Sequence, residues 1–284
     1  MKPFPFPLFL RCPRCGSPFT AVLGALRCDR GHAFDIAREG YVHLALRSRL
    51  VANADTAPMV EARLKFLSAG HFDPLTRALA QHAAEILRDQ DPARCVLDAG
   101  AGPGHYLAQV LDRVPDRLGL ALDLSKFAAR RAARAHPRIG AVVADLTQPL
   151  PVMDGVAGLG LSVFAPRPAQ ELWRVLGPGG ALVAVTPGPR HLGELIDRIG
   201  LLTVDTRKES RLRERMKDLF ELRAVDTIEH PIEVSRTEAS ALIGMGPNAF
   251  HLGPEEVERR LQALPDRMEL LASFRLHVFM RVAR

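Results

Sequence analysis

The chain has 284 residues, and 47% of them are hydrophobic. This length allows one large domain with its own core and a small additional module. The longest apolar stretches are far shorter than a membrane-spanning helix, and Met1-Lys2-Pro3 does not begin a secretory signal. We therefore expect a soluble, cytoplasmic protein without a membrane partner, in which cysteine thiols stay reduced.

Positive charge is concentrated at the start of the chain. The formal net charge is +6 with a pI near 9.5, and residues 1–50 hold eight arginines and lysines against three acidic residues. Such a concentration is typical of proteins that bind a phosphate backbone. An ordinary arginine-rich surface explains the same numbers equally well, so charge alone does not decide between the two.

Three cysteines and one histidine in the first residues have the spacing of metal ligands. Cys12, Cys15, Cys28 and His32 form the pattern C-x2-C-x12-C-x3-H, in which two short loops each turn two ligands toward one point. Three thiolates and one imidazole complete a tetrahedral shell for one Zn(II). Because four protein ligands leave no open position, we expect a structural zinc. A disulfide framework is excluded because three cysteines would leave an odd thiol, and the fourth cysteine, Cys95, lies in a predicted strand.

A polar linker and two helices are predicted next. The linker covers residues 47–55, and the helices cover residues 57–67 and 74–88. Met59, Ala62, Arg63 and Phe66 share one face of the first helix. We expect both helices to lead into a sheet and to cover its ligand.

A glycine-rich turn then follows a buried strand. Residues 95–97 are apolar, and Asp98-Ala-Gly-Ala-Gly-Pro-Gly104 separates them from a helix that starts near residues 107–111. Glycines allow the backbone to pass close beneath a cofactor, and Asp98 at the strand end can hold a cationic amino group. Taken alone, such a turn is a weak signal that many nucleotide-binding folds share.

The following strands place acidic residues at successive strand ends. The strand at 118–123 ends in Asp123, where a carboxylate binds ribose hydroxyls, and the strand at 141–144 is followed by Asp145 and Leu146, which are placed to contact an adenine. Further strands are predicted at 158–162 and, after a Leu-Gly-Pro-Gly-Gly turn, at 180–186. This alternation predicts an α/β fold with a doubly wound, Rossmann-like sheet.

Two cofactors suit such a sheet. A nicotinamide dinucleotide needs a G-x-G-x-x-G turn for its diphosphate, whereas this turn is G-x-G-x-G and begins with an acid that would repel a diphosphate. The order of acids favours a class I methyltransferase that uses S-adenosylmethionine. Farther along the chain, arginines and lysines alternate with acidic residues between positions 205 and 223. This pattern is more typical of a solvated helix than of an RNA contact. Late or edge strands are predicted at 224–234 and 268–283.

Several motifs together resemble the RlmA-type 23S rRNA (guanine-N1)-methyltransferases, a family that includes macrolide-resistance enzymes. They are the zinc cluster, Phe34-Asp-Ile-Ala-Arg-Glu-Gly-Tyr-Val42, Met59–Leu67 with Ala69-Gly-His-Phe72, Val96–Gly104, Asp123-Leu-Ser-Lys126 and Thr186-Pro-Gly-Pro-Arg-His-Leu192. The match covers about the first two thirds of the chain. It departs from the family where Phe72 replaces a frequent tyrosine and Ala54-Asp55 replaces Gly-Asp.

The resemblance implies a zinc-binding RNA-recognition module at residues 1–45 and a methyltransferase domain at residues 46–284. It implies methyl transfer to guanine N1 in a 23S rRNA hairpin near the peptide exit tunnel, with a homodimer as a further expected partner. Together with the positions argued above, the expected cofactor-binding residues are Phe72, Asp98, Gly100, Ala101, Gly102, Gly104, Asp123, Asp145, Leu146 and His191.

The N1 proton of guanine must leave during the transfer, so a base or a donor to O6 helps. No Asn/Asp-Pro-Pro-Tyr motif follows the fourth strand, where Ser162-Val-Phe-Ala-Pro166 stands instead. His191 is the candidate base and Arg190 the candidate partner of O6 or a phosphate, with a purely structural histidine as the alternative. Phe164 either stacks on the target base or packs in the core. A small-molecule methyltransferase and a non-catalytic zinc protein that binds rRNA are the other functions considered.

Overall fold

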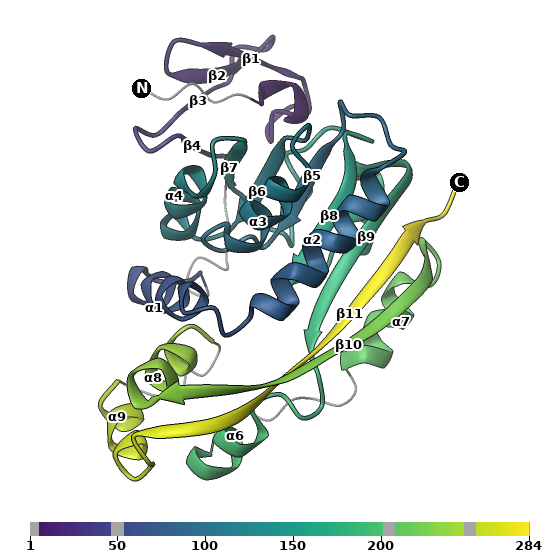
Figure 1. Cartoon of the computed structure of the whole chain (residues 1–284). Helices are drawn as coiled ribbons and strands as arrows, with labels where there is room; N and C mark the ends of the chain where they lie inside the picture. Colours follow the sequence, from purple (N-terminus) through teal and green to yellow (C-terminus); the bar gives the residue numbers. More distant parts are fainter. Residues whose placement is uncertain (1–5, 47–53, 201–207, 247–253, 284) are drawn as a thin grey trace.

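The computed structural model describes residues 6–46, 54–200, 208–246 and 254–283 (Figure 1). Its centre is an eight-stranded sheet with the strand order β10-β11-β9-β8-β5-β6-β7-β4. Strands β4 to β9 pair in parallel, and the long strands β11 and β10 extend the sheet in antiparallel fashion. Within these ranges no helix is both long enough and apolar enough to span a bilayer. The strands are β4 (Tyr41–His43), β5 (Cys95–Ala99), β6 (Gly119–Asp123), β7 (Ile139–Val143), β8 (Ala157–Val163), β9 (Leu176–Pro187), β10 (Phe220–Ser235) and β11 (Arg267–Arg281).

Helices cover both faces of this sheet, which confirms the doubly wound α/β fold. One apolar core lies between the sheet and α2, α3 and α4, and it continues beneath α8 and α9 along β10 and β11. The second core lies on the opposite face, where α5, α7 and the amino-terminal module pack. The helices are α1 (Ala57–Ser68), α2 (Asp73–Leu87), α3 (His105–Arg113), α4 (Lys126–Ala135), α5 (Ala169–Val175), α6 (Gly193–Ile199), α7 (Lys208–Met216), α8 (Arg236–Gly244) and α9 (Pro254–Gln262).

The predicted strands and helices of the large domain lie within a few residues of the observed ones. Two differences stand out. Strand β9 already begins at Leu176, so the Leu-Gly-Pro-Gly-Gly segment belongs to the strand, with Gly179 at a φ of 72°. Within the charged segment, α7 ends at Met216 and β10 already begins at Phe220. Residues 201–207, and residues 47–53 of the predicted linker, lie outside the described part. In α7, Arg213 pairs with Glu209 at 2.6 Å, as a solvated helix does.

The amino-terminal module is a small antiparallel sheet built from β1 (Phe19–Val22), β2 (Ala25–Cys28) and β3 (Ala33–Asp35), preceded by the short 3-10 helix η1 (Pro7–Phe9). The next strand, β4, leaves this small sheet. It pairs in parallel with β7 and forms one edge of the large sheet. The module is therefore continuous with the large domain through main-chain hydrogen bonds.

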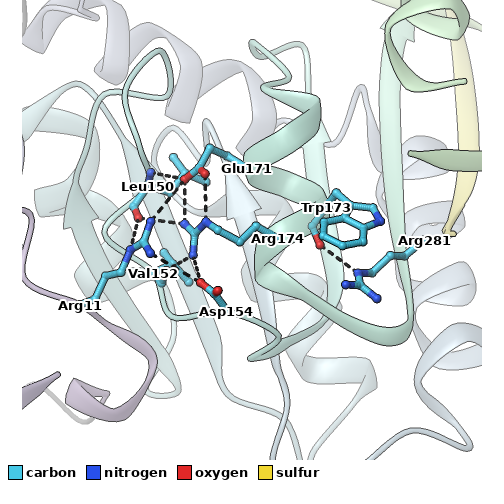
Figure 2. A network of polar contacts seen from close by, with 8 residues as sticks. All are labelled: Arg11, Leu150, Val152, Asp154, Glu171, Trp173, Arg174 and Arg281. Carbon is cyan, nitrogen blue, oxygen red and sulfur yellow. Dashed lines mark hydrogen bonds and ion pairs between the residues drawn. The ribbon is translucent and has the colours of Figure 1, made fainter. Parts of the chain in front are cut away.

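A second attachment lies around two arginines (Figure 2). Leu10 forms a β-bridge with Val152, and the Arg11 amide donates to the Pro151 carbonyl at 3.1 Å. Arg11 also lies 3.5 Å from Asp154, which Arg174 of α5 contacts at 2.5 Å. Arg174 donates in addition to the carboxylate of Glu171, 2.7 Å away, and to the main chain of Val152. These contacts fix the module on the face of the sheet that α5 covers.

Candidate zinc and cofactor sites

The four predicted metal ligands converge at one point. Cys12 and Cys15 lie in the loop before β1, Cys28 ends β2 and His32 follows it, and their ligand atoms all lie within 4.8 Å of one another. Cys95 is instead buried in β5, outside this group. Gly16 and Gly31, at φ of 78°, allow the tight turn in each ligand loop.

The distances between the ligand atoms match a tetrahedral zinc shell. The Cys15 and Cys28 sulfurs are 3.7 Å apart, and Nδ1 of His32 lies 3.6 Å from the Cys12 sulfur and 3.5 Å from that of Cys28. Ordinary zinc bond lengths in a tetrahedron give about 3.8 Å between two sulfurs and about 3.6 Å between sulfur and nitrogen. Burial raises the pKa of Cys12 to about 11, and backbone hydrogen bonding at Ser17 lowers the pKa of Cys15 to about 6. A bound cation would stabilise both thiolates. The cluster is thus suited to one structural zinc.

The glycine-rich turn needs its glycines for two reasons. Gly100, Gly102 and Gly104 have φ of 84°, 54° and 83°, a region that other residues rarely adopt. A Cβ at Gly100 would also lie 2.3 Å from the Cβ of Ala165, and one at Gly104 would lie 3.0 Å from the Cα of Ala132. The turn is thereby pressed between the segment after β8 and helix α4, with Ala101 buried inside it.

Asp98 is the most unusual group beside this turn. Its side chain is 1% exposed, and neither carboxylate oxygen has a hydrogen-bond partner among the described residues. Burial first, and the nearby charge of Asp123 second, raise the pKa of Asp98 to about 8. A buried acid without a partner is costly unless a ligand satisfies it. The amino group of S-adenosylmethionine would supply both a positive charge and hydrogen-bond donors.

Asp123 and Asp145 mark the neighbouring strand ends, as the sequence predicts. Oδ2 of Asp123 accepts a hydrogen bond from the Gly102 amide, and Oδ1 accepts one from the Ser125 amide, both at 2.8 Å. The carboxylate that the sequence predicts to bind the ribose is therefore oriented by the glycine turn itself. Oδ1 of Asp145 accepts from the Thr147 amide at 2.9 Å and from its hydroxyl at 2.7 Å. Leu146 reaches the same turn, because its Cδ1 lies 3.8 Å from a Cβ built at Gly100.

His191 lies in an aromatic group next to this cofactor site. Its ring centroid is 5.9 Å from that of Phe72, 4.9 Å from that of Phe274 and 6.5 Å from that of Phe164, with which it is nearly parallel. Phe72 is buried, whereas Phe164 is 44% exposed. Phe164 precedes Ala165, the residue that touches the glycine turn, so the exposed ring stands at the edge of the cofactor site.

The Ser273 amide donates to Nδ1 of His191 at 3.2 Å. In the neutral ring the proton is therefore on Nε2, which has no partner among the described residues. Burial lowers the pKa of His191 to about 4, so the ring is neutral at pH 7. Arg190 is exposed and pairs with Glu229. The positive φ of Phe164 and Leu192, 56° and 55°, marks strained backbone on both sides of this group.

The sequence analysis did not identify Ser273, Phe274 or Ser125 as neighbours of the site. The first two come from β11, some 80 residues beyond His191, and their positions depend on the β9–β11 register. Arg63 had a visible signal, since it is a charged residue on an otherwise apolar helix face. That signal predicts a buried ion pair or a ligand, and Arg63 does pair with Asp55.

Comparison with known proteins identifies the amino-terminal module and the family of the chain. The family model for the amino-terminal zinc ribbon of RlmA matches residues 10–45. A putative 23S rRNA (guanine-N1)-methyltransferase of Micromonospora griseorubida is 46% identical over 94% of this chain and 95% of its own length. The 23S rRNA (guanine(748)-N1)-methyltransferase of Streptomyces fradiae is 44% identical over 93% of this chain and 94% of its own.

A more distant relative is the putative 23S rRNA (guanine-N1)-methyltransferase YxjB of Bacillus subtilis, which is 33% identical over 65% of this chain and 66% of its own length. The relatives from Micromonospora griseorubida and Streptomyces fradiae match more than nine tenths of the chain. On this evidence the chain belongs to the family of 23S rRNA (guanine-N1)-methyltransferases.

Proposed function

We propose that this protein transfers a methyl group from S-adenosylmethionine to N1 of a guanine in a 23S rRNA hairpin. The observation that carries the proposal is the buried carboxylate of Asp98, which lacks a partner beside a glycine turn and next to the ribose-binding Asp123. A zinc protein that only binds rRNA would have no use for such a group. The target we expect is the guanine at position 748, as in the name of the Streptomyces fradiae relative.

In the proposed mechanism, S-adenosylmethionine supplies an electrophilic methyl group on its sulfonium. The chain holds the donor through Asp98 and Asp123, with Asp145 and Leu146 beside the adenine. Phe164 provides an exposed ring on which a flipped guanine stacks. Much of the rate then comes from the alignment of N1 with the methyl group.

His191 suits a donor better than a base. Its Nδ1 is already occupied by the Ser273 amide, so the neutral ring presents an N–H at Nε2. Such a group stabilises the negative charge that develops on O6 as the N1 proton leaves to solvent. Arg190 is held by Glu229 and would contact the RNA rather than the reacting atoms.

The zinc module is proposed to recognise the hairpin. Arg14, Arg27, Arg30 and Arg38 are all exposed, and within the described ranges none of them forms an ion pair. Arginines without acidic partners are available to phosphates, which dominate recognition of folded RNA together with its shape. A small-molecule methyltransferase would not need this surface.

The test is methylation of a 23S rRNA hairpin by the wild-type chain and by an Arg14→Ala/Arg30→Ala/Arg38→Ala variant. The variant should bind S-adenosylmethionine normally but RNA more weakly. The slope of the logarithm of the RNA-binding constant against the logarithm of the salt concentration should become less steep by up to about three units. A control variant replaces three exposed arginines far from the module, Arg198, Arg259 and Arg267. Wild-type rates for the module variant at subsaturating RNA would refute the recognition role. Absence of methylated guanine with the wild-type chain would refute the function.

Three further expectations accompany this function. Because the substrate is ribosomal RNA, the protein acts in the bacterial cytoplasm. Methylation of this hairpin would reduce macrolide sensitivity, which growth of an expressing strain in the presence of macrolides would reveal. The homodimer stays a prediction that analytical ultracentrifugation would test.

A further inference from the structure

Arg63 of α1 joins three segments that are far apart in the chain. Its Nη1 donates to the carboxylate of Asp55, and its Nη2 donates to the main-chain carbonyl of Met245, at the end of α8, over 2.6 Å. The Asp55 carbonyl in turn accepts from the Ser125 hydroxyl at 2.5 Å. The Arg63 side chain is 26% exposed, so it lies between the interior and solvent.

The guanidinium of Arg63 also lies against the glycine-rich turn. A Cβ built at Gly102 would be 3.2 Å from Nη1 of Arg63. The guanidinium therefore lies next to the main chain of the turn, with no side chain between them. The charge of Arg63 acts on two ionisable groups beside this turn, Asp123 and Tyr106. It opposes the burial that raises the pKa of Asp123, and it opposes the burial that raises the pKa of Tyr106, on which Asp98 also acts.

The donor's amino acid end carries two charges, and the chain offers a partner of opposite sign for each. Asp98 matches the ammonium, as argued above. The carboxylate needs a cationic donor on the same turn, and Arg63 is in place there. A guanidinium has five N–H groups, of which the contacts to Asp55 and Met245 use two. Arg63 can therefore bind a carboxylate without leaving either segment.

We propose that Arg63 binds the α-carboxylate of the methionine moiety of S-adenosylmethionine. This proposal rests on the proposed function only for the identity of the donor. Asp55 acts as a positioning residue, because it holds the guanidinium at the turn. Arginine suits this task because its planar fork matches both carboxylate oxygens. The contact makes α1 a cover of the donor site that recognises the complete amino acid end.

The test compares two ligands in calorimetric titrations: S-adenosylmethionine and its decarboxylated analogue, which lacks only the carboxylate. The wild-type chain should prefer the complete donor by about tenfold or more. Arg63→Gln should lose this preference through weaker binding of S-adenosylmethionine, with the affinity for the analogue changed less than about twofold. Arg63→Lys keeps the charge and should keep part of the preference.

Arg131→Gln is the matched control, because Arg131 is an exposed arginine of α4 that pairs with Glu61 of α1 at 2.8 Å. It removes a contact of the same helix and should leave both affinities unchanged. If Arg63→Gln weakens both ligands equally, Arg63 only holds α1 in place and the proposal is wrong. If Arg63→Gln unfolds, Arg63→Lys decides instead. A preference for the complete donor that is smaller than that of the wild type supports the carboxylate contact, and a preference equal to that of the wild type contradicts it. A wild-type chain that binds neither ligand would contradict the proposed function itself.

Discussion

The carboxyl group of Asp98 should make the protein without its donor less stable as the pH rises. In the folded chain its pKa is about 8 instead of 3.8, because the group is buried and lies near Asp123. The unfolded chain therefore releases this proton more readily than the folded one. The contribution of Asp98 to stability is full below pH 3.8 and is lost as the pH rises from there toward 8. Asp98→Asn removes the ionisation and should remove this pH dependence.

The size of the effect follows from the two pKa values. Between pH 5 and pH 8, linkage predicts that the free energy of unfolding of the wild type falls by about 3.5 kcal/mol relative to Asp98→Asn. The asparagine amide would also be buried without a partner, but this cost does not depend on pH. The stability of the wild type minus that of the variant should thus fall by this amount between pH 5 and pH 8, whatever its value at pH 5.

The measurement is urea unfolding of both proteins without ligand at pH 5, 6, 7 and 8. A stability difference that stays constant across this range would refute the reasoning, because it would mean that Asp98 ionises in the folded chain as it does in water. A second series at saturating S-adenosylmethionine tests the role of the group. A ligand at 100 times its dissociation constant stabilises by about 2.7 kcal/mol. We expect this gain for the wild type and little or none for Asp98→Asn.

Two further predictions concern the other sites. Removal of zinc by a chelator should unfold the three-stranded module while the large sheet keeps its circular dichroism, and a Cys12→Ala/Cys28→Ala variant with full metal content would show that the ligands are assigned wrongly. Asp123→Ala removes the carboxylate that the Gly102 amide orients, and it should weaken S-adenosylmethionine binding by about 10- to 150-fold, or about 1.5–3 kcal/mol. Unchanged binding in a calorimetric titration would overturn the ribose assignment.

The parts of the site that could be predicted are those that local spacing determines. Cys12 and Cys15 share one loop, and Cys28 and His32 share another, so ligand spacing alone predicts the cluster. The same holds for Asp98 and its glycine turn, where positive φ and close contact require glycine. Each ligand loop, like the turn after Asp98, has fewer than ten residues, so the residue types within it largely determine its geometry.

The parts that could not be predicted depend on contacts between distant segments. Ser273 meets His191 because β11 pairs with β9 in one particular register, and a shift by one residue would turn Phe274 away from the site. The tautomer of His191, and with it the choice between base and donor, follows from that register. No sequence pattern near residue 191 predicts this tautomer.

Strand β4 shows most clearly that the sheet to which a strand belongs can depend on residues outside that strand. It has three residues with only Val42 buried, so its pattern is too short to identify its sheet. Its pairing with β7 attaches the zinc module to the edge of the large sheet, next to the strand that leads to Asp145. The domain boundary at residue 45 stays a prediction. Strand β4 lies before this boundary but belongs to the large sheet.

This attachment has a consequence for the proposed RNA recognition. The module is held by β4 on one side and by Leu10, Arg11 and their partners on the other, so it cannot swing as a separate body without the loss of both sets of hydrogen bonds. The exposed arginines of the module therefore stand at a set distance from Phe164. A rigid platform loses little conformational entropy when RNA binds, which leaves more of the binding free energy to unstack one guanine and align it with the donor. If the module recognises the hairpin as proposed, the zinc would contribute to catalysis without touching the reacting atoms, because it would maintain the shape of the surface that positions the substrate.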